Sequence, residues 1–336
     1  MTTIYDIAKA AGVTAATVSN VLADKGSVSV ATRARIMKYV RELNYQPNLV
    51  ARSLIKGRTG IIGFVVPTLA NPFFAELTVE AELAAHEAGR RIFVTSLMNR
   101  EGEPSSELIN DLASRRVDGI LLASGSIYMK AIQLLANNPH LPIVHCLWEG
   151  KDEEALSVSF DFYQAGQIAA EHLLQLGHRR FGIASHVQSE NGLRNAGFHD
   201  TVLHSGCAAP VFQPSNSTIE GGRLAGHALL TLPSRPTAIF AGNDITAFGV
   251  MSMAWELGIR IPQDLSIIGL DDVAFASYTT PPLTSVRIDR KLIIKKALEL
   301  LMKAIGGEET GPQMLLPPTL MVRSSTSSPP DSMVSE

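Results

Sequence analysis

An arginine, an asparagine and an aspartate stand where their side chains could bind a small polar ligand. Arg194, Asn243 and Asp271 each come shortly after one of the apolar runs of this 336-residue chain. A guanidinium fork, an amide and a carboxylate make directional hydrogen bonds, which suits a polyhydroxylated molecule. Ligands of open α/β sheets bind where the strands end, so these side chains predict a ligand cleft. Asn243 and Asp271 are also typical of a helix cap and a strand end, and that interpretation stays open.

Six further polar or aromatic residues are candidates for the wall of this cleft. They lie at or after the ends of apolar runs, or before a helical stretch: Asn71, Phe73, Phe74, Trp148, Phe160 and Asn216. An aromatic ring offers a flat apolar plate for a sugar ring. Phe73 and Phe74 are also typical of an apolar interface.

No pattern of nucleophile, base or metal ligand accompanies these residues. The sequence contains no GxSxG, no HExxH, no P-loop and no glycine-rich dinucleotide fingerprint after its first strand. The nine histidines are dispersed, and Cys146 and Cys207 have no CxxC partner. We therefore expect no catalytic residues, no metal site, no cofactor and no enzymatic activity. The two cysteines, the lack of a roughly 18-residue apolar span and the lack of a secretion signal predict a cytoplasmic protein without a membrane partner.

The charge of the chain is divided unevenly. The net charge is −3, but residues 1–60 contain nine Lys and Arg against three Asp and Glu, so they carry +6 and the remainder carries −9. A basic segment on an acidic body indicates contact with a polyanion. A solvated basic surface is the alternative.

The basic segment begins with three predicted helices. Apolar residues recur at helical spacing over 4–11, 15–23 and 31–43, and Gly12 supplies a turn between the first two helices. Two short helices joined by a tight turn are typical of the helix-turn-helix.

The second predicted helix has a free face that can read bases. Asn20 can pair bidentately with adenine, whereas Ala15 and Ala16 offer only apolar contacts, for example to a thymine methyl. Plain helix-favouring alanines and a solvated asparagine are the alternatives. Hydroxyl and amide groups that suit phosphate oxygens belong to Thr14, Thr17, Ser29, Tyr45 and Asn48.

Residues 47–59 are predicted to be a linker. Pro47 ends the third helix, and Gly57 can end the short helical turn that follows. This turn is too short to be stable alone, so it orders only when something holds it. Leu54 is an apolar residue in this marginal helix, flanked by basic residues.

From residue 60 onward, apolar runs of four to seven residues alternate with helical stretches. The runs are 61–66, 91–97, 119–123, 142–147, 156–160, 181–184, 238–241 and 265–270. This alternation indicates parallel sheets covered on both faces. A TIM barrel and two linked doubly wound domains are both compatible with it. The polar, proline-containing end at 326–336 is predicted to be a flexible tail.

Short motifs in a shared order run through nearly the whole chain. They are 4–14, 17–22, 43–48 and 51–54 in the head, and 62–63, 71–74, 116–120, 176–179, 194–198, 235–238, 243–244, 258–264, 269–272 and 282–284 in the body. Together they resemble the lac repressor and purine repressor (LacI/GalR) family of bacterial transcription regulators.

This resemblance implies an α/β protein with an all-α helix-turn-helix head and a body like a periplasmic binding protein, made of two Rossmann-like lobes. The implied domains are a DNA-binding head at 1–46, a hinge helix at 47–59 and an effector-binding and dimerisation body at 60–325. Lobe 1 is expected at about 60–160 and 288–320, and lobe 2 at about 161–287 and 320–325. The resemblance implies a homodimer, and the tail shows no heptads for the tetramer-forming helix that some relatives have.

The resemblance also implies roles for residues of the head. Operator preference is set in the family by positions that match Ala15, Ala16 and Asn20. Leu54, with Ala51 in the same hinge, matches a leucine that wedges into a central minor-groove step. Tyr5 matches a position near the DNA.

In the body, the effector-binding positions of the family match Arg194, Asn243 and Asp271. Leu147, Phe160 and Ile288 depart from the pattern, because sugar-binding relatives often have Asp or Gln there. The cleft is therefore expected to be more apolar than a typical hexose site. A carbohydrate-like effector is expected: a sugar, a polyol or a sugar acid.

We therefore predict a ligand-responsive transcriptional repressor that binds a palindromic, double-stranded operator as a dimer. A cytosolic solute-binding protein, or a sugar-modifying enzyme with the same α/β body, is the alternative. Deletion of residues 1–59 discriminates between them, because only the repressor would lose DNA binding.

Overall fold

The computed structural model describes residues 2–22, 26, 28–45, 58–96, 112, 114, 116–123, 141–147, 155–186, 192–311 and 313–330. The chain divides into two compact units, Met1–Gly60 and Ile61–Glu336. We call them the head and the body and describe each by itself.

The head contains the three helices that the apolar spacing predicts. They are α1 (Ile4–Ala11), α2 (Ala15–Leu22) and α3 (Val30–Glu42). Thr3 and Asp6 form a capping box at the start of α1, and Gly12 ends the helix with φ 62°, a conformation that glycine adopts without steric cost. The core is small and apolar, with Ile7, Val18 and Ile36 at its centre. The turn between α1 and α2 confirms the predicted helix-turn-helix.

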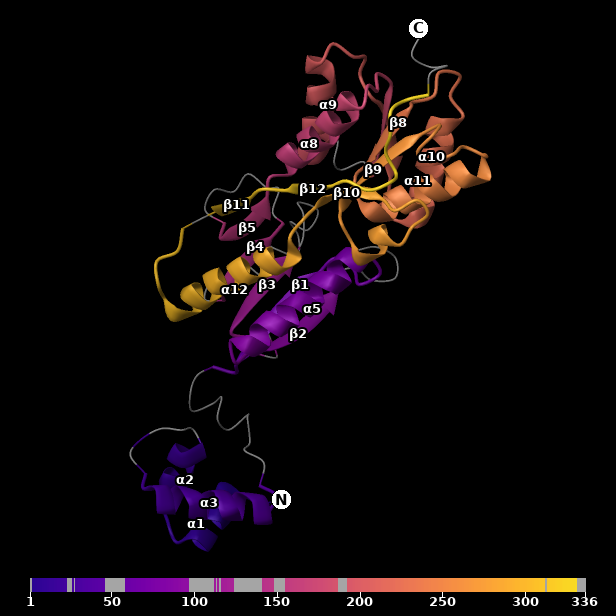
Figure 1. The fold of residues 1–336 in the computed structure, drawn as a ribbon. Helices are drawn as coiled ribbons and strands as arrows, with labels where there is room; N and C mark the ends of the chain where they lie inside the picture. Colours follow the sequence, from indigo (N-terminus) through magenta and orange to yellow (C-terminus); the bar gives the residue numbers. More distant parts are fainter. Residues whose placement is uncertain are drawn as a thin grey trace. The chain divides into compact units, whose positions relative to one another are not determined.

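The described residues of the body form two open sheets of six strands each, which decides against a TIM barrel (Figure 1). The first sheet has the order β11-β5-β4-β3-β1-β2, and its registered pairs are parallel. The second has the order β12-β10-β9-β8-β6-β7, with β10 and β12 antiparallel and the other pairs parallel. The strands of the first sheet are β1 (Ile61–Val66), β2 (Arg91–Ser96), β3 (Gly119–Ala123), β4 (Ile143–Cys146), β5 (Ser157–Phe160) and β11 (Gln313–Leu316). Those of the second are β6 (Phe181–His186), β7 (Val211–Ser215), β8 (Ala238–Ala241), β9 (Ser266–Asp271), β10 (Thr284–Arg287) and β12 (Thr319–Met321).

Helices pack on both sheets to make two lobes. The first lobe includes α5 (Pro72–Glu87) and α12 (Arg290–Gly306), which pack on each other and on the first sheet. The second lobe includes α8 (Phe162–Gln175), α9 (Leu193–His204), α10 (Ile219–Leu230), α11 (Asp244–Glu256) and the 3₁₀ helix η3 (Ala274–Ser277). The chain passes between the lobes after β5, after β10 and after β11.

Glycine lets α8 and α9 approach closely enough to place the start of α9. A Cβ atom at Gly166 would collide with the backbone oxygen of Arg194, and one at Gly197 would collide with the backbone oxygen of Tyr163. Close packing against α8 therefore fixes the position of α9 and of the backbone from which the Arg194 side chain extends.

The flexible tail predicted from residue 326 is wrong for Thr326 and Ser327. The hydroxyl of Thr326 lies 2.9 Å from Nε2 of His172, and the backbone oxygen of Ser327 lies 2.9 Å from Nε2 of buried His178. The Ser327 amide also donates to the hydroxyl of Ser266. Polar composition predicted solvation, but these polar groups bond to the second lobe instead. Residues 331–336 lie outside the described residues.

Candidate functional site

Helix α2 presents the face predicted to read bases. Val18 and Val21 are buried in the head core, whereas Ala16 and Asn20 are exposed on the opposite face. Ala15 is half-buried and packs against the core, so it offers less free surface than Ala16. Tyr5 on α1 is exposed.

Hydroxyl groups at the starts of the helices hold local hydrogen bonds. Thr14 Oγ1 accepts from the Thr17 amide at 3.2 Å and lies 2.9 Å from the Thr17 hydroxyl. Ser29 Oγ accepts from the Thr32 amide and donates to the Thr32 hydroxyl. These caps leave Thr14 and Ser29 exposed at helix N-termini, where backbone amides favour an anion.

The remaining predicted DNA contacts fall in two places. Tyr45 is half-buried and packs against the head core, with its amide bonded to the Val40 carbonyl. Asn48, Ala51 and Leu54 lie outside the described residues.

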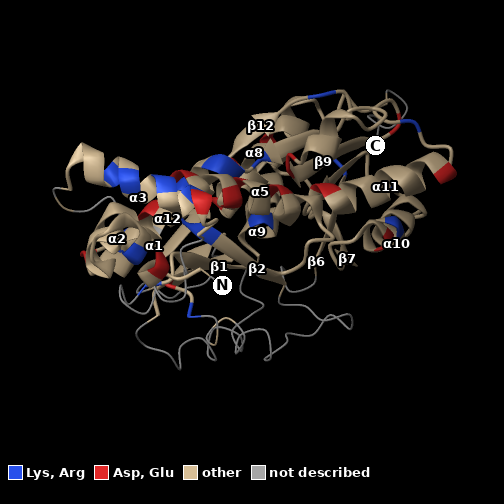
Figure 2. Ribbon diagram, turned by 90° about the horizontal axis from the view of Figure 1, so that it is seen from below, with Lys and Arg blue, Asp and Glu red and all other residues tan. Residues whose placement is uncertain are grey.

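Basic side chains of the head gather on α3. This helix carries Arg33, Arg35, Lys38 and Arg41 against one acid, Glu42 (Figure 2). The head can therefore meet a polyanion through helix termini and through a basic helix.

In the body, Arg194 and Asn243 meet at the start of α11. Arg194 Nη1 donates to the Gly242 carbonyl at 2.9 Å, and its guanidinium lies 4.4 Å from the ring centre of Phe162. Asn243 is buried, and its Oδ1 accepts from the Thr246 amide at 2.9 Å as the cap of α11. Beside this cap, Asn243 has the two N–H donors of Nδ2 and a second lone pair on Oδ1 with which it can bond a polar group.

Asp271 ends β9 beside these groups. It is buried and has φ 119°, a left-handed backbone that is unusual outside glycine. Burial raises the pKa of Asp271 well above its ordinary value, and the charge of Asp244 adds to this, while Arg194 and Arg290 oppose it. The structure thus brings Arg194, Asn243 and Asp271 together, with two guanidinium groups that act on one carboxyl.

Of the aromatic candidates, Phe73 and Phe160 lie in the packed interior of the first lobe, and Phe74 is half-buried against it. Phe73 is buried and makes an edge-to-face contact with Phe74, with ring centres 5.3 Å apart. Asn71 caps α5, with Oδ1 accepting from the Phe73 amide at 3.0 Å. Phe160 is buried in the same apolar cluster as Phe73. Phe73 and Phe160 are thus packed in an apolar cluster, with Phe74 partly buried against it.

Two candidates are not placed with this group. Asn216 is exposed, and its Oδ1 accepts from the Thr218 hydroxyl at 2.5 Å just before α10. Trp148 lies outside the described residues.

The sequence did not show that Asp244 holds the turn that follows Asp271. Asp244 is fully buried, with Oδ1 accepting from the Ser285 hydroxyl at 2.6 Å and Oδ2 from the Val273 amide at 2.8 Å. Burial raises the pKa of Asp244 to about 7. Asp244 stands next to the candidate Asn243 in the sequence, but its partners Val273 and Ser285 are 29 and 41 residues away, so the sequence could not indicate these bonds.

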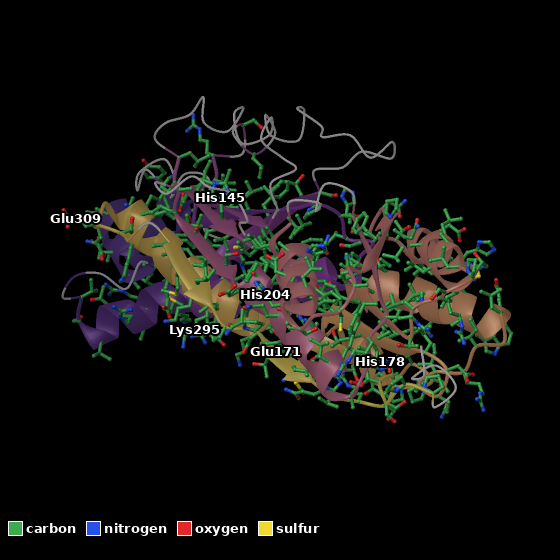
Figure 3. All side chains as sticks on the ribbon, turned by 90° about the horizontal axis from the view of Figure 1, so that it is seen from above. His145, Glu171, His178, His204, Lys295 and Glu309 are labelled. Atoms are coloured by element: carbon green, nitrogen blue, oxygen red, sulfur yellow. The ribbon has the colours of Figure 1, made fainter. Side chains whose placement is uncertain are left out.

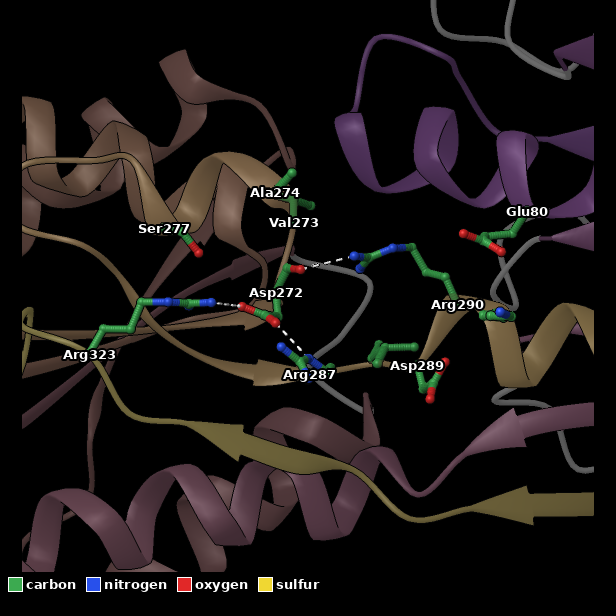
Figure 4. A pocket seen from close by; sticks show the side chains of 11 residues that line it. Glu80, Asp272, Val273, Ala274, Ser277, Arg287, Asp289, Arg290 and Arg323 are labelled. Atoms are coloured by element: carbon green, nitrogen blue, oxygen red, sulfur yellow. Dashed lines mark hydrogen bonds and ion pairs between the residues drawn. The ribbon is translucent and has the colours of Figure 1, made fainter.

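A polar cavity of about 370 Å³ opens beside Asp272 (Figure 4). Arg287 and Arg323 bind the Asp272 carboxylate at 2.7 Å and 2.6 Å. None of the residues predicted to bind effector lines this cavity, which is bordered by Glu80, Asp272, Val273, Ala274, Ser277, Arg287, Ile288, Asp289, Arg290, Lys291 and Arg323.

The histidines are distributed over both lobes. Figure 3 shows His145, His178 and His204 apart from one another, and they lie on β4, just before β6 and at the end of α9. Over the described part of the chain, no three His, Cys, Asp or Glu side chains are arranged to hold a metal ion. The described helices include none that is long and apolar enough to cross a membrane.

Two family models match the chain. One describes bacterial regulatory proteins of the lacI family and matches residues 3–48. The other describes a periplasmic binding protein-like domain and matches residues 170–326.

Known proteins are similar over 80% to 97% of this chain. The HTH-type transcriptional repressor PurR of Photobacterium profundum is 32% identical over 97% of this chain and 98% of its own. The crystal structure of the lac repressor dimer bound to operator and the anti-inducer ONPF has a TM-score of 0.87 and 27% identity, covering 97% of this chain and 99% of that one. A LacI family transcriptional regulator from Enterococcus faecium with bound ribose has a TM-score of 0.71 and 26% identity, covering 80% of this chain and 99% of that one.

Proposed function

The chain belongs to the lacI family of bacterial regulatory proteins, and on this premise we propose that it is a homodimeric repressor of a palindromic operator, controlled by a carbohydrate-like effector. It is a DNA-binding transcriptional regulator that responds to a small molecule, not an enzyme. The alternatives of a solute-binding protein and a sugar-modifying enzyme are set aside, because a relative matched over 97% of the chain is a repressor. A regulator of transcription acts on the chromosome, so we place it in the cytoplasm.

The observation that carries this proposal is the two-sided character of α2 within a basic head. One side of α2 packs Val18 and Val21 into the core, and the other exposes Ala16 and Asn20. We assign α2 to the major groove, with Asn20 as the residue that reads a base and Ala15 and Ala16 as apolar contacts.

Phosphate and hinge contacts complete the proposed operator interface. Thr14, Thr17 and Ser29 stand at helix starts that attract phosphate. Tyr5, Tyr45 and Asn48 are proposed to contact the backbone. Ala51 and Leu54 are proposed to form the hinge at 47–59, with Leu54 inserted in the minor groove.

We propose that the effector binds where Arg194, Asn243 and Asp271 meet. Two guanidinium groups, an amide and a carboxyl can hold hydroxyl or carboxylate groups of a sugar, a polyol or a sugar acid. Phe73, Phe74 and Phe160 supply an apolar wall, to which we add Asn71, Trp148 and Asn216 as candidates. The ribose bound by the similar regulator from Enterococcus faecium supports this ligand class.

We propose that α5 and η3 contribute to the dimer contact of the body. Val79 and Leu83 of α5 are 54% and 55% exposed, and Phe275 and Tyr278 at η3 are 63% and 83% exposed. The Ala274 amide donates to Glu76 Oε1 of α5, so the two apolar groups lie on adjoining elements. Burying such side chains against a second copy removes apolar surface from water.

We further propose the domain limits 1–46, 47–59 and 60–325. The similar lac repressor structure contains operator, so we assign the lobe arrangement described here to the operator-binding state. Effector binding then shifts the population toward or away from this arrangement.

The test starts from selection of duplexes from a random library by the full-length protein. A palindromic sequence is expected, with affinity falling roughly 10³-fold or more between 50 and 200 mM salt as phosphate contacts are screened. A thermal-shift screen of D-ribose, other sugars, polyols and sugar acids then identifies the effector. Failure to select any sequence, with or without these compounds, would contradict the proposal.

A further inference from the structure

One arginine of the first lobe reaches the effector segment of the second. Arg290 opens α12, and its Nη1 donates to the backbone oxygen of Asp271 at 2.8 Å. Its Nη2 donates to the backbone oxygen of Asp272 at 3.0 Å (Figure 4). The rigid fork of a guanidinium matches two successive carbonyls, which a single ammonium cannot do equally well.

Glu76 joins the same contact from α5. Its Oε2 pairs with Arg290 Nη2 at 2.9 Å, and its Oε1 accepts from the Ala274 amide at 3.0 Å. The side chains of Arg290 and Glu76 are 18% and 28% exposed, so water screens this pair less than a surface pair. Two helices of the first lobe thus hold the backbone from Asp271 to Ala274.

The backbone held in this way is strained. Asp271 and Asp272 have φ 119° and 53°, and left-handed residues other than glycine persist only where their surroundings hold them. Ser285 and Asp244 accept from the next two amides, at Asp272 and Val273, but both acceptors belong to the second lobe and move with the turn. Arg290 and Glu76 belong to the first lobe, so their bonds break when the lobes separate.

Arg290 also touches the other side of the proposed effector site. Its guanidinium lies 5.7 Å from the ring centre of Phe73 on α5. One side chain therefore links an aromatic wall residue in the first lobe to the carboxyl-bearing turn in the second. The charges of Arg290 and Glu76 also act on the pKa of Asp271, in opposite directions.

We propose that Arg290 is a positioning residue that, together with Glu76, joins the two lobes at Asp271 and couples the geometry of the effector site to the lobe arrangement. The bonds of Arg290 and Glu76 to residues 271–274 are called the clasp below. This inference rests on the proposed function. Lobe separation costs the turn two donors and one acceptor, while the β10 ladder and the Ser285 and Asp244 bonds stay with the second lobe, so the turn is held from both lobes only in the clasped arrangement. By reciprocity, a ligand that moves Asp271 shifts the lobes.

Hydrogen exchange of the full-length, ligand-free protein tests the clasp. Arg290→Met and Glu76→Gln are each expected to speed exchange of the segment 271–276 at least 10-fold, and the double variant is expected to add little to either. Arg287→Met is the matched control, because it removes a cation from Asp272 within the second lobe and leaves the Ala274 amide bond intact. Unchanged exchange in Arg290→Met overturns the clasp.

Operator affinity without any small molecule tests the coupling, with the duplex selected by the wild-type protein as the probe. Arg290→Met is expected to weaken binding at least fivefold, Arg290→Lys is expected to recover part of the loss, and Arg287→Met is expected to change it less than twofold. Faster exchange with unchanged operator affinity overturns the coupling. If Arg290→Met does not fold, Arg290→Lys and Glu76→Gln carry both measurements. Failure to select a duplex overturns the proposed function, while the exchange measurement still decides the clasp.

Discussion

The head and the body differ in where their polar side chains form hydrogen bonds. In the head, the bonds that cap the helices join residues three positions apart, as in Thr14–Thr17 and Ser29–Thr32; a bond over 41 residues, from the Thr2 hydroxyl to the Leu43 carbonyl, is exposed, and the core is apolar. In the body, buried polar groups bond over long sequence distances, as in Asp244–Ser285 at a separation of 41 residues and Glu76–Ala274 at 198. Local structure therefore places the capping groups of the head on its surface. In the body, only the assembled lobes bring such groups together, so a substitution at one of them removes a bond to a segment that is distant in the sequence.

The largest expected effect comes from a substitution that lowers the stability of the body alone. Gly166→Val forces a side chain into the backbone of Arg194 on α9 and is expected to destabilise the body by about 3 kcal/mol or more. For a domain of this size, that is roughly a 6–12 °C drop in the melting temperature of the body. Calorimetry measures the body transition, and circular dichroism of the head helices is expected to be unchanged. A parallel loss of head helicity would contradict the independence of the two units.

The next effect isolates the hinge. Leu54→Ala removes the proposed minor-groove wedge and is expected to weaken operator binding about 100-fold, a loss of a few kcal/mol. Gel shift with the selected duplex measures this, and the thermal shift caused by effector is expected to stay at the wild-type value. Equal operator affinity in the variant would remove the wedge from the mechanism.

A smaller effect tests base reading by α2. Asn20→Ala is expected to cost about 1–3 kcal/mol of discrimination and to relax preference at one position of each half-site. Competition between the selected duplex and its single-base variants gives the measurement. Ser19→Ala, on the same exposed helix, serves as the control. A uniform loss over all sequences would assign Asn20 to phosphate rather than to a base.

The last comparison concerns pH and the body interior. Burial lowers the pKa of His178 to about 4, and its neutral ring holds Thr237, Ser266 and the Ser327 carbonyl. The unfolded histidine titrates near 6.5, so the unfolded state binds the proton first. The stability from this neutral ring is present above pH 6.5 and is lost as pH falls toward 4. His178→Gln is expected to melt lower at pH 7.5 and to lose less stability between pH 6.5 and 4 than the wild type, and parallel melting curves would exclude the role.

Prediction from sequence succeeded where apolar spacing is strong. The strands 61–66, 119–123 and 238–241 and the helix 4–11 have the observed bounds, because burial follows directly from the apolar pattern. It missed β7 and β10–β12, which are short edge or crossing strands. β7 includes Pro214 and pairs on one side, so its sequence lacks the signature of a buried strand.

The same distinction applies to the candidate site. Arg194, Asn243 and Asp271 could be named from the sequence, because they lie at or after the ends of predicted strands, and a strand end places its neighbouring residues at the edge of the sheet. Arg290 carried no such signal. A charged residue at the start of a helix is ordinarily solvated, and no nearby residue in the chain indicates that Arg290 donates hydrogen bonds to the other lobe.

Local sequence thus determined the two units, the helix-turn-helix and the candidate residues at the strand ends, because each depends on contacts between near neighbours in the chain. Tertiary structure alone decided that Glu76, Asp271 and Arg290 meet, that Asp244 is buried and that residues 326–327 are packed. These contacts depend on three crossings between lobes, and the entropy of closing such long loops is recovered only when whole sheets have formed.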